Sequence, residues 1–193
     1  MQSPLYFFTV EEYLELEQTS DIRHEYFAGE VFAMAGGSKE HNIISGNVYS
    51  RLRSRLRGSS CKVFMSDMKV RINLANENQT IFYYPDVIVS CDTEDQDRYF
   101  LNYPCLIIEV LSPSTETIDR REKLLNYRSL ASLKEYILIS QDEVKVEVYR
   151  QDEKRNWTIQ TLINRDDKLH LDSVGLILEM TDIYEDVINV AIM

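Results

Sequence analysis

The chain is poor in the residues that interrupt, crosslink or specialise a fold. Its 193 residues include 6 glycines, 4 prolines, 3 cysteines, 3 histidines and 1 tryptophan. So few glycines and prolines exclude a linker-rich or low-complexity chain, and this length predicts one domain over residues 1–193. Cys61, Cys91 and Cys105 are odd in number and show no paired spacing, so they predict neither a disulfide framework nor a zinc site.

Long apolar runs and basic charge are scarce as well. No stretch approaches the roughly 20 apolar residues that cross a bilayer, and no targeting segment opens the chain, so we expect a soluble protein without membrane contact. Unpaired cysteines favour the reducing cytoplasm. The 21 basic and 32 acidic residues give a formal net charge of -11. This charge counts against nucleic-acid binding unless basic groups gather on one face, or metal ions reverse the field at clustered carboxylates.

Hydrophobic periodicity predicts alternating helices and strands, hence an α/β or α+β fold. The segment Thr9–Glu12 resembles a capping box that opens a helix, and a second helix is expected from Ser38 to Gly58. Its arginines, Arg51, Arg53, Arg55 and Arg57, are expected on a solvated helix surface. Further helices are expected from Ile118 to before Lys134 and over Asp182–Val190. The expected strands are His24–Phe27, Glu30–Met34, Lys62–Ile72, Ile81–Ser90, Leu106–Leu111, Glu135–Ile139 and several in the C-terminal third.

Two carboxylates in strands stand out chemically. Glu109 lies in an otherwise apolar segment, where an isolated charged side chain would lose its hydration at high cost. Asp86 follows Pro85 at the head of another predicted strand, a position where an aspartate also commonly caps a turn. Carboxylates on neighbouring strands can hold one hard divalent cation and leave room for water and a phosphate oxygen. Lys123 has a plainer interpretation, a helix-surface ion pair with Asp119 at i,i+4.

Short motifs surround this acid pair in a fixed order: Arg23, Glu25, Gly29-Glu30, Met34, Ser38, His41, Pro85-Asp86, Ile108–Thr115, Asp119, Lys123, Tyr127 and Glu135-Tyr136. Together they resemble the Uma family, abundant in cyanobacteria and classed as restriction endonucleases. That family is similar to the PD-(D/E)XK nuclease superfamily. The resemblance covers most of the chain. It implies a restriction-endonuclease-like core, in which helices flank a central mixed sheet with extra C-terminal strands.

The resemblance also implies roles for individual residues. Asp86 and Glu109 would bind Mg²⁺ or Mn²⁺, with the carbonyl of Val110 as a further ligand. Leu111 occupies the position where the superfamily usually has its catalytic lysine, and Leu111 can neither activate water nor bind phosphate. The Uma family moves that lysine to the next helix, which corresponds to Lys123, and Asp119 would orient it from one helical turn away.

Three more residues match the family's pattern with weaker implications. Glu25 would be a third acid at the site, although an exposed strand position fits it nearly as well. His41 would face the substrate, with packing at a helix start as the alternative. Tyr127, on the helix of Lys123, would face the substrate too, as would Asp119. The family resemblance and the apolar end Val187, Ile188, Val190, Ala191, Ile192 and Met193 suggest a homodimer, the alternative being that this end docks within its own chain.

Three functions are compatible with these residues. The first is a magnesium-dependent endonuclease acting on nucleic acid, preferably DNA, with Lys123 stabilising the transition state or positioning the attacking water. The second is a catalytically silent nuclease fold that binds or assembles with a partner, which the charge of -11 and Leu111 favour. The third is a metal-dependent hydrolase of another phosphate ester, because such a site does not by itself select nucleic acid.

Overall fold

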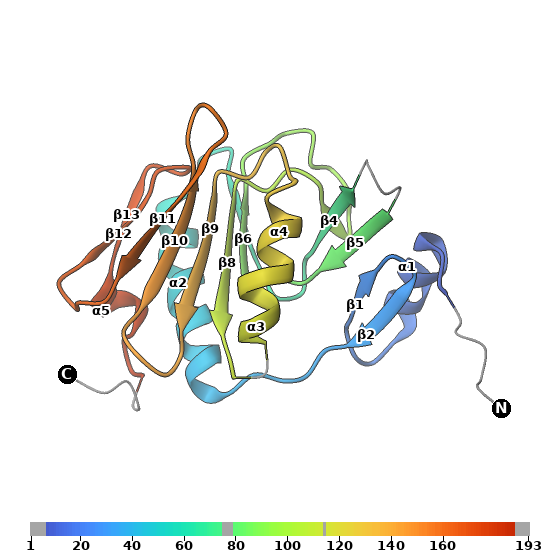
Figure 1. The fold of residues 1–193 in the computed structure, drawn as a ribbon, viewed down its shortest axis with the longest axis horizontal. Helices are drawn as coiled ribbons and strands as arrows, with labels where there is room; N and C mark the ends of the chain where they lie inside the picture. The colour runs from blue at the N-terminus through green and yellow to red at the C-terminus, as the bar shows by residue number, and fades with distance from the viewer. Residues whose placement is uncertain (1–6, 75–78, 114, 188–193) are drawn as a thin grey trace.

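The computed structural model describes residues 7–74, 79–113 and 115–187. A six-stranded mixed sheet lies at its centre (Figure 1), with the strand order β11-β10-β9-β8-β6-β3. β8 and β9 run parallel, and every other neighbouring pair is antiparallel. Every residue of β8 is buried, as expected for a central strand covered on both faces. The strands are β3 (Lys62–Met65), β6 (Val87–Ser90), β8 (Leu106–Leu111), β9 (Glu135–Ser140), β10 (Val146–Gln151) and β11 (Trp157–Leu162).

One face of this sheet is covered by helix α2 and the C-terminal elements. Ser38 caps α2 by accepting a hydrogen bond from the backbone N–H of His41 at 3.0 Å. The buried stripe of α2 packs on alternate residues of β6 and β8, including Ile108 and Val110. The elements on this side are α2 (Lys39–Arg55), β12 (Lys168–Leu171), β13 (Leu176–Glu179) and α5 (Met180–Ile183).

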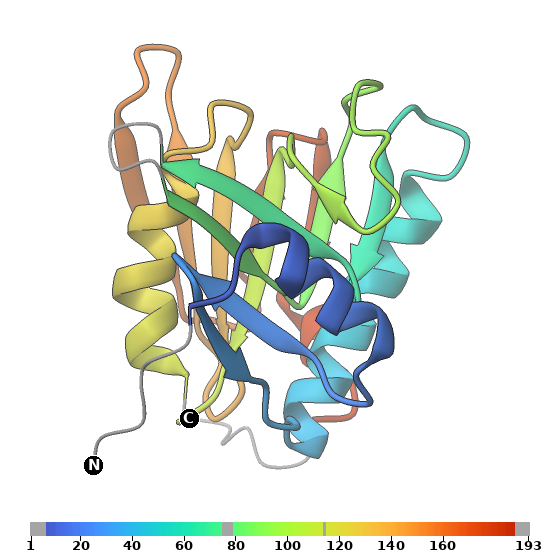
Figure 2. The ribbon, with the colours of Figure 1, turned by 90° about the vertical axis from the view of Figure 1, so that its right-hand side faces the viewer.

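A second sheet of five strands and a helical segment lie on the opposite face (Figures 1 and 2). The residues of β8 that point to this face, Ile107 and Leu111, pack with the second sheet and the helical segment in one apolar cluster. Glu109 shares this parity, so its side chain points toward the second sheet and the helical segment. The elements are β1 (His24–Phe27), β2 (Glu30–Ala33), β4 (Lys69–Leu74), β5 (Gln79–Tyr83), β7 (Phe100–Leu101), α3 (Glu116–Ile118), η1 (Asp119–Lys123) and α4 (Leu124–Tyr127).

Helix α1 (Val10–Thr19) packs on the outer side of the second sheet (Figure 2). The expected capping box is present: the Thr9 hydroxyl accepts from Glu12 N at 3.2 Å, and Glu12 Oε2 accepts from Thr9 N at 2.8 Å. The hairpin of β1 and β2 also confirms the sequence prediction, with Ala28 and Gly29 at its turn in positive φ. The expected arginine surface is confirmed too, because Arg51 is about half exposed and forms ion pairs with Asp182 and Glu185.

Two strand predictions were wrong in the same way. The expected strand Lys62–Ile72 is divided into β3 and β4, and the expected strand Ile81–Ser90 is divided into β5 and β6. In each case the halves belong to different sheets. The chain turns from one sheet to the other at residues 66–68 and again at 84–86. Both halves of each run are apolar and rich in residues that favour strands, so hydrophobic periodicity did not indicate where the chain passes from one sheet to the other.

The expected closing helix Asp182–Val190 was misplaced. Helix α5 begins earlier and ends at Ile183, because the chain leaves the helix at Tyr184 and reaches a left-handed residue at Asp186. Positions 188–193, which include most of the apolar end, lie outside the described residues, whereas Val187 packs against the core. No helix in the described ranges is long and apolar enough to span a membrane.

The expectation of three unpaired cysteines was also wrong. Cys61 and Cys91 form a disulfide across 30 positions, and Cys105 is free. The pairing follows from the ladder of β3 and β6, in which Lys62 lies opposite Ser90. Cys61 and Cys91, which lie just outside this pair, therefore face each other. The sequence spacing could not reveal this, because it does not show which strands become neighbours.

Candidate active site

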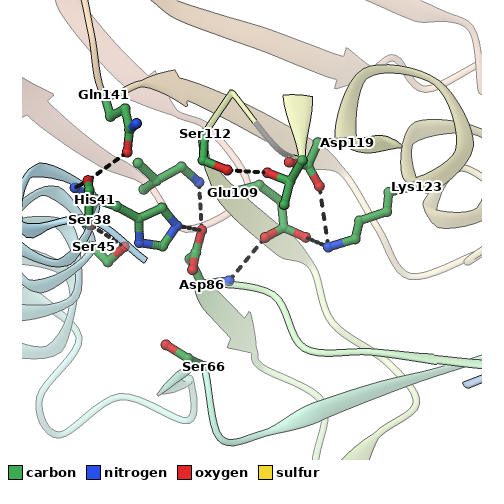
Figure 3. Close-up of polar contacts among 12 residues, drawn as sticks. Ser38, His41, Ser45, Ser66, Asp86, Glu109, Ser112, Asp119, Lys123 and Gln141 are labelled. Carbon is green, nitrogen blue, oxygen red and sulfur yellow. Dashed lines mark hydrogen bonds and ion pairs between the residues drawn. The ribbon is translucent and has the colours of Figure 1, made fainter. Parts of the chain in front are cut away.

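Asp86 and Glu109 lie side by side where β6 begins and β8 nears its end (Figure 3). The two strands are antiparallel neighbours, with Val87 opposite Ile108, and this register brings the acids together. The N–H of Asp86 donates to Glu109 Oε2 at 3.2 Å, and Asp86 Oδ2 accepts from the N–H of Val110 at 2.7 Å. Each acid is thus fixed by the backbone of the other strand.

Lys123 reaches Glu109 from the helical segment (Figure 3). Its Nζ donates to Glu109 Oε1 at 3.2 Å, and the Tyr127 hydroxyl donates to the same oxygen at 3.1 Å. Leu111, in contrast, is buried in the apolar cluster. The ammonium group beside Glu109 therefore comes from the helical segment and not from position 111. Lys123 is buried, so its interpretation as a surface residue was wrong.

Two further carboxylates flank the same ammonium. Glu25 Oε1 lies 3.1 Å and Asp119 Oδ1 lies 3.3 Å from Lys123 Nζ. Asp119 and Lys123 bound η1, a stretch of wide helical turn of the kind that often occurs at functional sites. Glu25 faces the site from β1 rather than solvent, since its side chain is only 20% exposed.

His41 joins the cluster from the first turn of α2. Its Nε2 lies 3.1 Å from Asp86 Oδ2, so Asp86 lies between the histidine and the Val110 N–H. Burial alone would lower the pKa of His41, but the hydrogen bond and charge of Asp86, the charge of Asp119 and a hydrogen bond to the Val110 backbone together raise it. The structure thus brings all seven candidate side chains, Glu25, His41, Asp86, Glu109, Asp119, Lys123 and Tyr127, into one cluster around Val110.

The cluster is rich in negative charge and largely buried. Burial raises the pKa of Glu109 well above its usual range, opposed by Lys123 and reinforced by the charges of Asp119, Asp86 and Glu25. For Lys123 burial acts the other way, but the charges of Glu109, Glu25 and Asp119 outweigh it and raise the pKa. The lysine is therefore held as an ammonium ion, while the acids remain crowded around it.

The donor set fits a hard divalent cation. Glu25 Oε1 and Asp119 Oδ1 are buried, and the Lys123 ammonium is the partner of both, with no further hydrogen bond to either oxygen within the described part of the chain. Four carboxylates face one ammonium and one histidine, and such crowding is relieved by a cation. No three His, Cys, Asp or Glu side chains in the described ranges surround a common metal position. A pair of carboxylates such as Asp86 and Glu109 is nevertheless a donor set that Mg²⁺ accepts, because this ion binds through one or two carboxylates and keeps several waters.

Two residues that position the site were missed from the sequence. Gln141, buried just after β9, accepts a hydrogen bond from the Ser38 hydroxyl at 2.9 Å and thereby ties the start of α2 to the sheet. The Tyr136 hydroxyl donates to the carbonyl of Asp119 at 3.1 Å and thereby ties the start of η1 to β9. A polar residue at the end of a buried strand was the available signal for Gln141. Tyr136 belonged to the motif Glu135-Tyr136, but nothing indicated this contact, because a tyrosine in an apolar strand is ordinary core.

A family model described as "Putative restriction endonuclease", Uma2, matches residues 10–181. The chain belongs to the Uma2 family. Two similar proteins are both uncharacterized and come from Synechocystis sp. One, slr1290, is 39% identical over 175 residues, covering 90% of each chain, and the other, sll1609, is 32% identical over 158 residues, covering 80% of this chain and 87% of its own.

A crystal structure titled as a putative nuclease belonging to DUF820 from Anabaena variabilis has a similar fold. Its TM-score is 0.74 at 18% identity, covering 94% of this chain and 99% of that one. At this identity the likeness concerns the fold alone. It confirms the expected fold, a mixed sheet with flanking helices.

Proposed function

We propose that this Uma2 protein is a nuclease that uses Mg²⁺ or Mn²⁺ to hydrolyse phosphodiester bonds in DNA. The observation that carries the proposal is the buried set of Asp86, Glu109 and Lys123. Glu109 is fixed by three donors. Burying an ammonium together with its carboxylates costs hydration that their pairing repays only in part, and such clusters are common at functional sites. A divalent ion held by Asp86, Glu109 and the Val110 carbonyl would acidify water and polarise a phosphate oxygen.

The residues of the chain have distinct tasks in this proposal. Lys123 presents its charge to the phosphoryl oxygens as negative charge develops in the transition state. Asp119 and Glu25 keep the ammonium group in place, and Tyr127 holds the Glu109 carboxylate. His41 fixes the orientation of Asp86 through Oδ2. Burial of the cluster excludes bulk water, which strengthens each of these charge interactions.

The test is a metal titration combined with a cleavage assay. Calorimetry with Mg²⁺ is carried out on the full chain, Asp86→Asn, Glu109→Gln and the control Asp166→Asn, whose side chain is exposed. We expect binding in the wild type and control, and none in Glu109→Gln. The same proteins are incubated with supercoiled plasmid, linear duplex and single-stranded DNA, and with RNA. Only the wild type and the control are expected to cut.

The outcomes separate the three candidate functions. Folded protein that neither binds Mg²⁺ nor cuts any nucleic acid would refute the proposal and favour a silent binding module. Metal binding that depends on Glu109 without cleavage of DNA or RNA would retain the metal site but indicate another phosphate ester. The homodimer and the cytoplasmic location remain predictions, for sedimentation and localisation measurements to test. The disulfide removes the argument for the cytoplasm that rested on unpaired cysteines.

A further inference from the structure

A second polar region lies at the other end of the helical segment from Lys123. A pocket of about 370 Å³ opens between the end of α4, the loop that follows it, and the β10–β11 hairpin. In Figures 1 and 2 the end of α4 and this hairpin turn lie at the same end of the central sheet. The pocket is lined by Arg128, Ser129, Leu130, Gln151, Arg155 and Trp157, among others. It shares no residue with the acid cluster.

The walls of the pocket offer flat surfaces and positive charge. The guanidinium of Arg128 lies over the ring of Trp157, with 5.6 Å between its central carbon and the ring centroid. Indole rings and guanidinium planes are the side-chain surfaces on which unpaired bases stack. Arg155 adds a second cation from the hairpin turn, where its backbone has a φ of +64°. Although the net charge of the chain is -11, Arg128 and Arg155 give the lining of this pocket a local positive charge.

One residue that lines the pocket also carries a hydrogen-bond acceptor without a partner in the described part of the chain. Gln151 Oε1 is buried and has no hydrogen-bond partner among the residues that the structure describes. The backbone of Gln151 is fixed, since its N–H donates to the Lys134 carbonyl at 2.9 Å and it pairs with Trp157 in the β10–β11 ladder. A carboxamide presents an acceptor and a donor side by side, which matches the edge of adenine.

We propose that this pocket binds an unpaired nucleobase, preferably adenine, together with its phosphate. The base would stack on Trp157 and Arg128, Gln151 would pair with its edge, and Arg155 would contact the phosphate. The volume suits one nucleotide and is too small for a base pair in a duplex. That the base belongs to a nucleic-acid strand rests on the proposed function, whereas recognition of the base does not.

The position of the pocket suits a strand that also reaches the acid cluster. Arg128 lies five residues beyond Lys123, which is roughly 8 Å along a helix at 1.5 Å per residue. A single strand crossing the helical segment could therefore present one phosphodiester to the acids and one base to the pocket. Such an arrangement favours frayed ends, overhangs or single strands over intact duplex.

The experiment uses Trp157, the one tryptophan of the chain, as its own reporter. Its fluorescence is followed in EDTA, so that no metal-dependent cleavage can occur, during titration with dAMP, dTMP, a ten-nucleotide deoxyadenosine strand and a blunt duplex of the same length. We expect quenching by dAMP and more strongly by the single strand, weaker quenching by dTMP, and little response to the duplex. Arg128→Gln should weaken binding of the single strand, and Arg53→Gln, on the exposed surface of α2, should not.

The role of Gln151 is tested by a change in base preference rather than by a loss of binding. Gln151→Glu keeps the shape of the side chain but replaces the mixed edge by acceptors alone, so adenine should bind roughly tenfold more weakly and cytosine should gain. A merely structural glutamine would not exchange one base for another. Equal binding of all bases by the wild type and Gln151→Glu would therefore overturn base recognition.

The remaining outcomes are equally decisive. No fluorescence response to dAMP or to the single strand at millimolar concentration would show a water-filled surface pocket and overturn the proposal. A response to dAMP but not to the strand would retain base recognition and assign the site to free nucleotides. Glu109→Gln should respond like the wild type, because Glu109 does not line the pocket. Failure of the cleavage assay would thus leave the fluorescence result standing, and the converse also holds.

Discussion

Asp86 and Glu109 are joined through the backbones of two neighbouring strands. The Asp86 N–H donates to the Glu109 carboxylate, and the Asp86 carboxylate accepts from the N–H of the residue after Glu109. These bonds fix both acids by main-chain geometry rather than by flexible side chains. The spacing of the two carboxylates is therefore set by the register of β6 and β8, and it changes only if that register changes.

The acid pair was predictable because its signal was local. Glu109 was conspicuous as the one charge in Leu106–Leu111, and desolvation makes such a residue costly at any position in a core. Its three donors could not be derived, since they come from a helix and from another strand. The Lys123 contact followed from family resemblance, because the i,i+4 spacing to Asp119 describes a surface pair equally well.

The errors arose where the answer depended on distant pairing. Residues 66–68 and 84–86 carry the chain between sheets, but each lies within a run that reads as continuous strand. Cys61 and Cys91 meet only because β3 and β6 pair in one register. The pocket at Trp157 was equally invisible, since its walls come from two segments whose contact is tertiary.

Removing the disulfide should lower the stability of the native state. The crosslink closes a loop of 30 positions, for which the chain-entropy model gives about 3 to 4 kcal/mol. Both cysteines must be replaced, by serine, because Cys105 Sγ lies 3.6 Å from Cys91 Sγ and could pair with a lone Cys91. Urea unfolding of the double variant measures the loss, and Cys105→Ala is the comparison that retains the crosslink. Equal unfolding free energies for double variant and wild type would contradict the prediction.

Cys105 should be a slow nucleophile at neutral pH. Burial raises the pKa of its thiol to about 11, and only the thiolate reacts, so alkylation by iodoacetamide should accelerate about tenfold per pH unit between pH 8 and 10. The folded state favours the neutral thiol. Its contribution to stability is therefore complete below the unfolded pKa of about 8.5 and is lost as the pH rises toward 11. A rate that levels off near pH 9 in the native protein would refute this assignment.

Glu135 should matter for stability and not for cleavage. Its buried carboxylate accepts from Arg150 Nε at 2.9 Å and Ser173 N at 2.9 Å, and so holds the β12–β13 hairpin to the central sheet. Glu135→Ala removes the acceptor of Ser173 N and leaves Arg150 with Asp172 as its remaining acid, so it should cost about 2 kcal/mol. Glu143→Ala, which removes an exposed acid near Lys145, should cost less than about 0.5 kcal/mol. Denaturant unfolding compares the two, and cleavage per folded molecule should be equal in both.

Lys123 gives a prediction that separates a structural ion pair from a cation site. Lys123→Met removes the ammonium from a buried cluster of carboxylates and should destabilise metal-free protein by about 3 kcal/mol. If Asp86 and Glu109 hold Mg²⁺, saturating Mg²⁺ should restore much of this loss, because a ligand present at 100 times its dissociation constant stabilises by about 2.7 kcal/mol. Arg121→Met changes an exposed cation in the same helical segment and should alter neither measurement. Thermal unfolding with EDTA and with Mg²⁺ tests both effects. If Mg²⁺ does not restore the stability of Lys123→Met, the lysine only balances the charge of the carboxylates. Any loss of cleavage in that variant should then be explained by its unfolded fraction alone.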